Sequence, residues 1–320
     1  MTIVANTFTT FAAIGNREDL VDKIWNVSAV DTPFMASIDK VKATATLHEW
    51  QTDILAAAAT NAQLQGDDVT FSAVVPTVRL TNRTQNLRKD CVISGTQDAV
   101  SKAGRKREIT YQLLKKNKEL NRDLEFNLTQ INVKTAGNSS AAPYMAALEN
   151  WYDQTASAIT TSSRGTNGTG STSGQSVVCT DGTQRALTES LLKTVIQNTY
   201  TNGGEVDLIM AGPFNKTVIS GFTGNSTRIQ DSGADKKLVA AINVYESDFG
   251  VHRIRANRFQ RERTVHCLQT DLWALATLRP KQTHDLAKTG DAEKAMIITE
   301  VTLESRNDSG SGAVADLTTS

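Results

Sequence analysis

Residues 105–130, RKREITYQLLKKNKELNRDLEFNLTQ, form the stretch that decides the fold. The stretch contains neither Gly nor Pro, and most of its residues are good helix formers. Between densely charged positions, apolar side chains recur at helical spacing, at Ile109, Leu113, Leu120, Leu124 and Leu128. The pattern predicts one amphipathic helix about 39 Å long. Such a rod can brace a thin, wide molecule, or it can lie on the surface of an ordinary globule.

The bulk composition argues against several classes of protein. Among 320 residues there are 34 Lys and Arg and 34 Asp and Glu, so the net charge is zero. A protein that holds nucleic acid by charge alone would be basic, whereas weak self-repulsion suits a chain that packs against copies of itself. The three cysteines, Cys91, Cys179 and Cys267, are too scattered for a disulfide framework, so we expect folding in a reducing compartment. With no long apolar run and no secretory signal, we expect no membrane association.

The first third of the chain predicts short elements separated by polar segments. Residues 16–27 predict a short amphipathic helix, and 33–38 predict one further helical turn. Residues 43–55 predict a strand. VTFSAVVPTVRL (69–80) and RTQNLRKDCVIS (83–94) predict the two strands of a long antiparallel hairpin. Because its faces carry few core residues, we expect this hairpin to rest on another subunit.

The remainder predicts a mixed domain and a late strand. TTSSRGTNGTGSTSGQ (160–175) predicts a flexible surface loop. Between 185 and 280 a helix (185–200), a buried strand (206–211), a second helix and several short strands predict a compact α/β or α+β domain. KAMIITEVTLESR (294–306) is the strongest strand pattern of the chain. The tail after Asn307 is rich in Gly and Ser, which predicts disorder.

The search for catalytic motifs is negative. No GxGxxG, HExxH, CxxC or GxSxG occurs, and the four histidines share no ligand spacing. We therefore expect no catalytic residue, no cofactor and no metal site. An α+β enzyme that uses His48 or His252 is the alternative from another class. The basic run HRIRANRFQRER (252–263) could touch phosphates, but a solvated or intersubunit face explains it more simply.

Several ordered segments together resemble a known family. They are NREDLVDKIWNVSAVDTPFMASI (16–38), TLHEWQTDIL (46–55), TQNLRKDCVISGTQ (84–97), YQLLKKNKELNRDLEFNL (111–128) and DLIMAGPFNKTVISGF (207–222). This sequence resembles the major capsid proteins, also called major head proteins, of tailed bacteriophages with the Hong Kong 97-type fold. The resemblance runs from about residue 16 to residue 306.

The resemblance implies an α+β fold with four parts, to which the composition adds a flexible tail (307–320). The four parts are an N-terminal arm (1–45), a strand plus extended loop (46–95, with the hairpin at about 56–90), a peripheral domain (96–184 and 281–306) with spine helix 105–130, and an axial domain (185–280). We expect the arm and the hairpin to gain their order from neighbouring subunits, because both are too polar to hold a shape alone.

The resemblance also implies a function. The chain would self-assemble into pentamers and hexamers of an icosahedral shell that encloses the double-stranded DNA genome, in the bacterial host cytoplasm. Scaffold, portal and decoration proteins would be potential partners, and packaged DNA would be touched non-specifically. An encapsulin-like compartment shell is the alternative. The candidate subunit contacts are Trp25, Phe34, Phe71, Val75, Arg79, Arg83 and Arg88. The candidate genome-facing or intersubunit cations are Lys115, Lys116, Lys118, Arg253 and Arg255.

Overall fold

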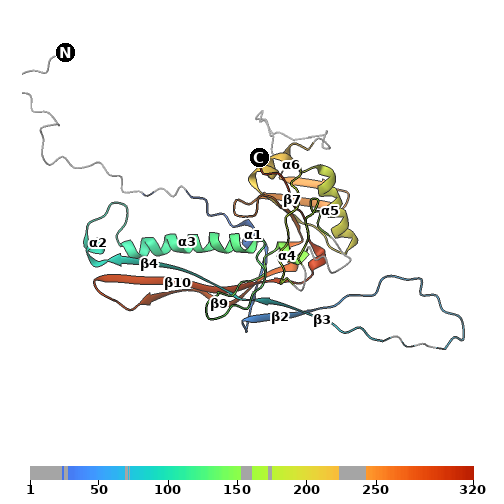
Figure 1. Ribbon diagram of the computed structural model, residues 1–320, viewed down its shortest axis with the longest axis horizontal. Helices are drawn as coiled ribbons and strands as arrows, with labels where there is room; N and C mark the ends of the chain where they lie inside the picture. The colour runs from blue at the N-terminus through green and yellow to red at the C-terminus, as the bar shows by residue number, and fades with distance from the viewer. Residues whose placement is uncertain are drawn as a thin grey trace, which may run out of the picture.

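The computed structural model describes residues 24, 28–68, 71, 73–152, 161–171, 175–222 and 243–320. The molecule is long and thin, with a helix lying along a sheet at one end and a small second domain beside it (Figure 1). A two-stranded ribbon projects beyond both. Apart from Ile24, the residues of the predicted helix at 16–27, Trp25 among them, lie outside the described residues.

The predicted long helix is confirmed as α3 (Glu108–Leu128). Its apolar stripe is buried against β4 (Gln85–Ser94) and β10 (Ala292–Ser305), with Leu120, Leu124 and Leu128 at most 4% exposed. Burial of each such side chain stabilises the fold by about 1.5–3 kcal/mol. The helix begins later than predicted because Arg107 is extended and Asp98 Oδ1 accepts the backbone N–H of Glu108 over 3.1 Å.

A four-stranded sheet lies beneath α3, in the order β1-β9-β10-β4. The strand predicted at 294–306 is confirmed as β10, which pairs antiparallel with both β9 (Trp273–Leu286) and β4. The short strand β1 (Asp39–Lys42) runs parallel to β9. The preceding helix α1 (Pro33–Ser37) inserts Phe34 into the core. Residues 33–43 of the predicted arm are therefore ordered by their own subunit.

The predicted hairpin between 69–80 and 83–94 is wrong. The structure pairs β3 (Val78–Arg83) with β2 (Leu47–Thr52), and β4 joins the four-stranded sheet instead. The physical reason is burial, because Leu87 and Cys91 of β4 lie under α3 and have no equivalent on β3. The projecting hairpin thus spans 47–83 rather than about 56–90, and residues 53–77 form its extended loop.

The second domain contains a five-stranded sheet, in the order β11-β8-β5-β7-β6. The sheet consists of β5 (Leu208–Ala211), β6 (Val244–Ser247), β7 (Gly250–Ala256), β8 (Val265–Leu268) and β11 (Gly312–Val314). The predicted strand at 206–211 is confirmed as β5, and the two predicted helices as α5 (Glu189–Thr201) and α6 (Pro213–Ser220). The predicted boundary at residue 280 is wrong, since β9 begins at Trp273 in the other sheet.

Two segments predicted to be flexible are built into this domain. The predicted disordered tail 307–320 instead supplies β11, which pairs with β8, and buries Val314 and Leu317 completely. The segment 161–171 lies alongside the tail, with Thr161 fully buried. A Cβ at Gly312 would lie 2.7 Å from the Thr161 carbonyl oxygen, so only glycine allows this approach. Gly- and Ser-rich composition here reflects close packing.

Short helices complete the chain. They are α2 (Gly95–Ala99), which precedes α3, α4 (Glu149–Tyr152), and the two 3₁₀ turns η1 (Thr270–Leu272) and η2 (Asp308–Gly310). Leu208, Met210 and Leu268 of the five-stranded sheet join the core of the four-stranded sheet, so the two domains share one hydrophobic cluster. Within the described ranges, no helix is long and apolar enough to cross a bilayer.

Candidate assembly surfaces

The root of the β2–β3 ribbon is held firmly on the sheet beside it. His48 Nε2 lies 2.8 Å from Glu304 Oε2, and the Trp50 indole donates a hydrogen bond to the Ser305 carbonyl oxygen over 2.6 Å. On β3, the buried Asn82 amide donates to the Leu303 carbonyl oxygen over 2.7 Å. These contacts fix the direction in which the extended loop leaves the body.

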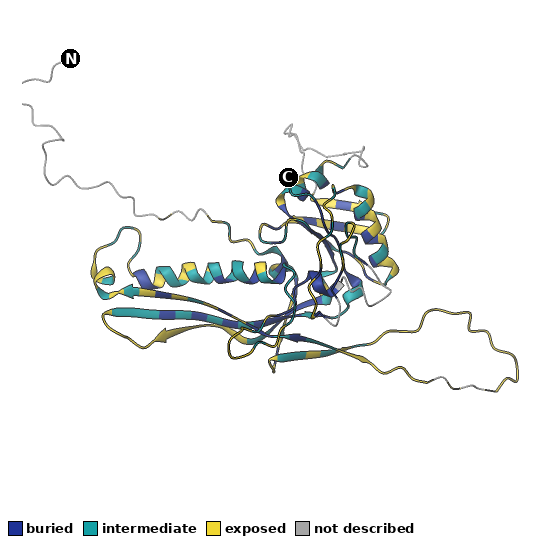
Figure 2. Cartoon of the chain, viewed as in Figure 1, coloured by how far each residue is buried: buried dark blue, intermediate teal, exposed yellow. Residues whose placement is uncertain are grey.

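The extended loop itself exposes an unusual number of apolar side chains. Six of them are between 80% and 93% exposed: Ile54, Leu55, Leu64, Phe71, Val74 and Val75. The loop projects away from the rest of the chain and is exposed throughout its described length (Figure 2). Exposed apolar side chains gathered on one projecting segment indicate a site of protein–protein contact.

The predicted subunit-contact residues fall into different environments. Phe71 and Val75 lie on the extended loop, Arg79 is exposed on β3 at 3.7 Å from Glu49, and Arg88 is exposed on β4. Arg83, at the end of β3, is half-buried. Phe34 must be corrected, because it is completely buried in the core of its own subunit and can touch no neighbour.

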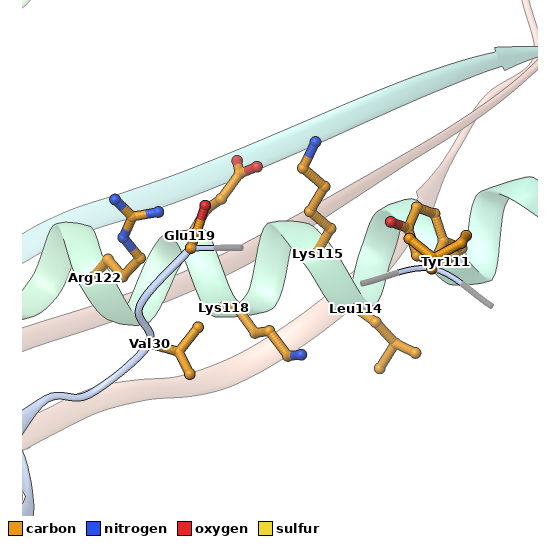
Figure 3. Close-up of a pocket in the computed structure, with 9 residues that line it drawn as sticks. Val30, Tyr111, Leu114, Lys115, Lys118, Glu119 and Arg122 are labelled. Carbon is orange, nitrogen blue, oxygen red and sulfur yellow. The ribbon is translucent and has the colours of Figure 1, made fainter. Parts of the chain in front are cut away.

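The predicted cations on α3 do not act as one group. Lys115 and Lys118 are exposed and line a hollow of about 400 Å³ on the side of α3 that faces away from the sheet (Figure 3). Arg122, one turn further, lines the same hollow. Lys116 instead binds Glu119 at 2.8 Å, and this hydrogen bond raises the pKa of Lys116.

The second pair of predicted cations, Arg253 and Arg255, is exposed on β7. Their partners across the parallel ladder are Leu208 and Met210 of β5, whose side chains point toward the shared core. Side chains at paired positions share one face of a sheet. The two arginines therefore lie on the same face of the sheet as Leu208 and Met210, one strand closer to the edge strand β6.

The histidines show no catalytic arrangement. His48 lies on β2, whereas His252 is buried on β7 between the Val206 carbonyl oxygen and Ser247 Oγ, both at 2.6 Å. Burial lowers the pKa of His252. Burial lowers the pKa of His266 to about 3 and raises the pKa of the Cys267 thiol to about 12, so neither group is charged near neutral pH.

In the described part of the chain, there is no group of three or more His, Cys, Asp or Glu side chains that could hold a metal ion.

A buried ion network that sequence reasoning missed joins the two domains. The fully buried carboxylate of Glu149 accepts from Arg164 at 2.9 Å and from Arg261 at 3.3 Å. Arg263 continues the network to Asp181 at 3.0 Å and to Asp316 of the tail at 3.4 Å. The basic run 252–263 had suggested a solvated or intersubunit face. Its last two arginines instead hold distant segments together, which no local pattern could reveal.

Comparison with known proteins connects these features to a family. Residues 3–318 match the model of the SU10 major capsid protein family. A major capsid protein of Escherichia phage Phieco32 is 29% identical over 340 residues, covering 96% of each chain. A chain of the cyanophage A-1(L) capsid asymmetric unit has a TM-score of 0.64 at 13% identity, covering 98% of this chain and 99% of that one. A chain in the structure of phage G major capsid and decoration proteins has a TM-score of 0.52 at 11% identity, with 98% and 99% covered. The chain belongs to the SU10 major capsid protein family.

Proposed function

We propose that this major capsid protein assembles, through contacts between copies of itself, into pentamers and hexamers that close into an icosahedral shell around double-stranded DNA. One observation carries the mechanism. The extended loop 53–77 is rooted firmly on its own subunit, yet its apolar side chains have no core to enter. Association of copies would bury them, and each would contribute about 1.5–3 kcal/mol before the entropic cost of ordering the loop is subtracted.

The architecture supports assignment to the Hong Kong 97-type fold. In this proposal α3 is the spine helix and, with the four-stranded sheet, forms the peripheral domain. The five-stranded sheet with α5 and α6 is the axial domain, and it includes the tail strand β11. A loop that leaves one subunit to meet a different surface of the next makes a head-to-tail contact, and such contacts form a ring when the rotation between successive copies closes. The function rests on binding, not on catalysis.

Further partners follow from the same proposal. Arg253 and Arg255 are exposed cations that can touch packaged DNA through its phosphates, without reading its sequence. The net charge of zero limits how many phosphates one subunit neutralises. The phage G structure contains decoration proteins, which supports a decoration protein as a partner here, beside scaffold and portal proteins. Cys91, Cys179 and Cys267 form no disulfide with one another, which fits assembly in the reducing cytoplasm of a bacterial host.

Electron microscopy of purified particles tests the proposal directly. We expect closed icosahedral shells with five- and six-fold capsomers. A chain that stays a monodisperse monomer under all assembly conditions, with or without a scaffold protein, would contradict it. The encapsulin-like alternative predicts shells that hold protein and lack nucleic-acid absorbance, whereas the family match favours a phage capsid.

A further inference from the structure

We propose that β9 of one copy pairs antiparallel with β9 of a second copy across a two-fold axis, along residues 281–285, and that this contact joins neighbouring rings of the shell. The inference rests on the proposed function and adds a second kind of contact to it. Head-to-tail contacts can close a ring, whereas a two-fold contact between identical surfaces links a subunit of one ring to a subunit of the next.

The outer half of β9 is an open sheet edge. The short strand β1 pairs with β9 as far as Thr277, whose carbonyl oxygen accepts the Ala43 N–H over 3.0 Å. Beyond this point, among the residues that the structure describes, no strand pairs with 279–286 on the side away from β10. These residues are exposed and lie at the end of the molecule remote from the β2–β3 ribbon (Figure 1). Unpaired backbone groups on such an edge are a template for a further strand.

The register of the sheet shows which backbone groups point to this edge. The Gly95 N–H donates to the Asp291 carbonyl oxygen over 3.2 Å, at the position that continues the pairing of β4 with β10. Backbone groups of successive residues point to opposite sides of a strand, so the even-numbered residues of β10 between 292 and 298 face β9. Their partners are the even-numbered residues of β9 from 282 to 286. The N–H and C=O groups of Lys281, Thr283 and Asp285 therefore point to the open edge.

The charges along this edge are complementary to themselves. Lys281 and Asp285 each lie two residues from Thr283, so antiparallel pairing about Thr283 places Lys281 opposite Asp285 of the partner subunit, on both sides of the axis. Both side chains lie on the face toward α3, where the Lys281 ammonium donates a hydrogen bond to the Asn121 side chain. Opposite charges directly across two strands stabilise their pairing, and a shifted register would separate them.

The ends of the open edge restrict what can pair with it. Pro280 has no N–H group and cannot extend the ladder, and after Leu286 the chain turns toward β10 through Gly290, at a φ of 80°. Pro and Lys on an edge strand discourage pairing with an arbitrary strand. A second copy overcomes this effect because its Asp285 neutralises Lys281. The occupant that fits this edge is therefore the same edge of another subunit.

A symmetric disulfide tests the pairing. The Cα atoms of a hydrogen-bonded antiparallel pair lie about 5.5 Å apart, within the range that a disulfide spans. We expect shells of Thr283→Cys to give covalent dimers on mild oxidation, measured on a non-reducing gel. Gln282→Cys is the matched control, because its side chain points to the other face and lies opposite His284 of the partner subunit. No dimer from Thr283→Cys, or equal dimer yields from the two variants, would overturn the pairing. The three natural cysteines are buried in the subunit.

A charge reversal supplies a second readout. Lys281→Asp places like charges across the axis, so we expect the shell yield to fall by roughly tenfold or more while separate rings accumulate. Adding Asp285→Lys restores the complementarity and should restore the yield. Lys288→Asp reverses an exposed cation just outside the paired segment and should leave the yield unchanged. Normal shells from Lys281→Asp, or no recovery in the double variant, would overturn the pairing. Wild-type chains that form no shells would instead refute the proposed function.

Discussion

The side-chain amide of Asn257, directly after β7, donates a hydrogen bond to Glu125 Oε1 of α3 over 2.7 Å. The same carboxylate accepts the backbone N–H groups of Phe34 over 2.8 Å and Met35 over 3.0 Å, in the first turn of α1. One fully buried side chain thus connects the arm, the long helix and the five-stranded sheet.

Removal of this acceptor should destabilise the subunit strongly. Glu125→Ala removes the acceptor of three donors, the buried Phe34 N–H and Asn257 amide and the partly buried Met35 N–H, and each donor left unsatisfied costs about 1–3 kcal/mol. We therefore expect the free energy of unfolding to fall by at least about 3 kcal/mol, as measured by urea denaturation of the unassembled chain. Asn257→Ala removes one donor but leaves the carboxylate with two, so a smaller loss is expected. Equal losses in the two variants would contradict the central role of Glu125.

The same carboxylate predicts a pH dependence. Burial raises the pKa of Glu125 above that of an unfolded glutamate, against the effect of its hydrogen-bond donors. A raised pKa in the folded state means that folding takes up a proton, so the stabilising contribution is complete below about pH 4.3 and declines as the pH rises through the folded pKa. The free energy of unfolding of wild type, relative to that of Glu125→Gln, should therefore fall as the pH rises from about 4.3 through the folded pKa of Glu125. Parallel pH profiles of the two proteins would refute the shift.

The ion network around Glu149 should be sensitive to the loss of a single partner. Arg261→Ala leaves a fully buried carboxylate with Arg164 as its one charged partner among the residues that the structure describes, and breaking a buried pair in this way costs about 3–5 kcal/mol. We expect a loss of this size in denaturant unfolding. Arg253→Ala removes an exposed cation of the same basic run and should change stability by less than about 0.5 kcal/mol. A similar effect of both substitutions would show that the network is not structural.

The structure shows which features local sequence patterns can predict and which they cannot. The stripe that ends in Leu124 and Leu128 specified α3, and the apolar run of β5 specified a buried strand, because periodicity and burial are encoded within a few residues. Pairing is not encoded in this way. The β4 strand follows β3 after a single residue, yet it joins another sheet because Leu87 and Cys91 can be buried only under α3. Strand pairing therefore depends on which segments, often far apart in the sequence, can be buried in the same core.

The same holds for the assignment of side chains to the surface or to the core. The apolar residues of the extended loop could be assigned to the surface from their polar surroundings, but Phe34 could not be assigned to the core, since its burial depends on α3 and β9 far along the chain. The tail was misjudged because its Gly and Ser content resembles disorder. Its buried positions, Val314 and Leu317, form too short a pattern to outweigh that composition.

The tail offers a direct test of its structural role. Leu317 is completely buried against the core of the five-stranded sheet, so Leu317→Ala should cost about 2–5 kcal/mol in urea unfolding. The matched substitution Leu55→Ala removes a side chain that is 93% exposed and should leave stability unchanged. A tail that is flexible in solution would tolerate Leu317→Ala equally well, and the two unfolding midpoints would then coincide.

The extended loop predicts the opposite pattern, with assembly affected and stability preserved. Phe71→Ser and Val75→Ser change side chains that are 91% and 80% exposed, so the free energy of unfolding of the unassembled chain should not change measurably. Shell yield, measured by sedimentation, should fall because these side chains can be buried only by a neighbour. Val178→Ser, at a residue that is 44% exposed and lies outside the loop, is the control. Wild-type yield from the double variant would exclude a role for these two residues in assembly.

The proposed contact with the packaged genome predicts a salt-dependent loss of DNA when the β7 arginines are replaced. Each phosphate that a cation neutralises contributes a slope of about −0.9 to the dependence of log K on log salt concentration. Replacing Arg253 and Arg255 with Gln should therefore make filled shells release DNA at lower salt, without changing shell yield, because both side chains are exposed on β7 and stabilise no core. DNA release is measured by nuclease sensitivity across a salt series. Lys193→Gln, on the opposite helical layer, should behave as wild type, and identical release curves for all three proteins would place the β7 arginines away from the genome.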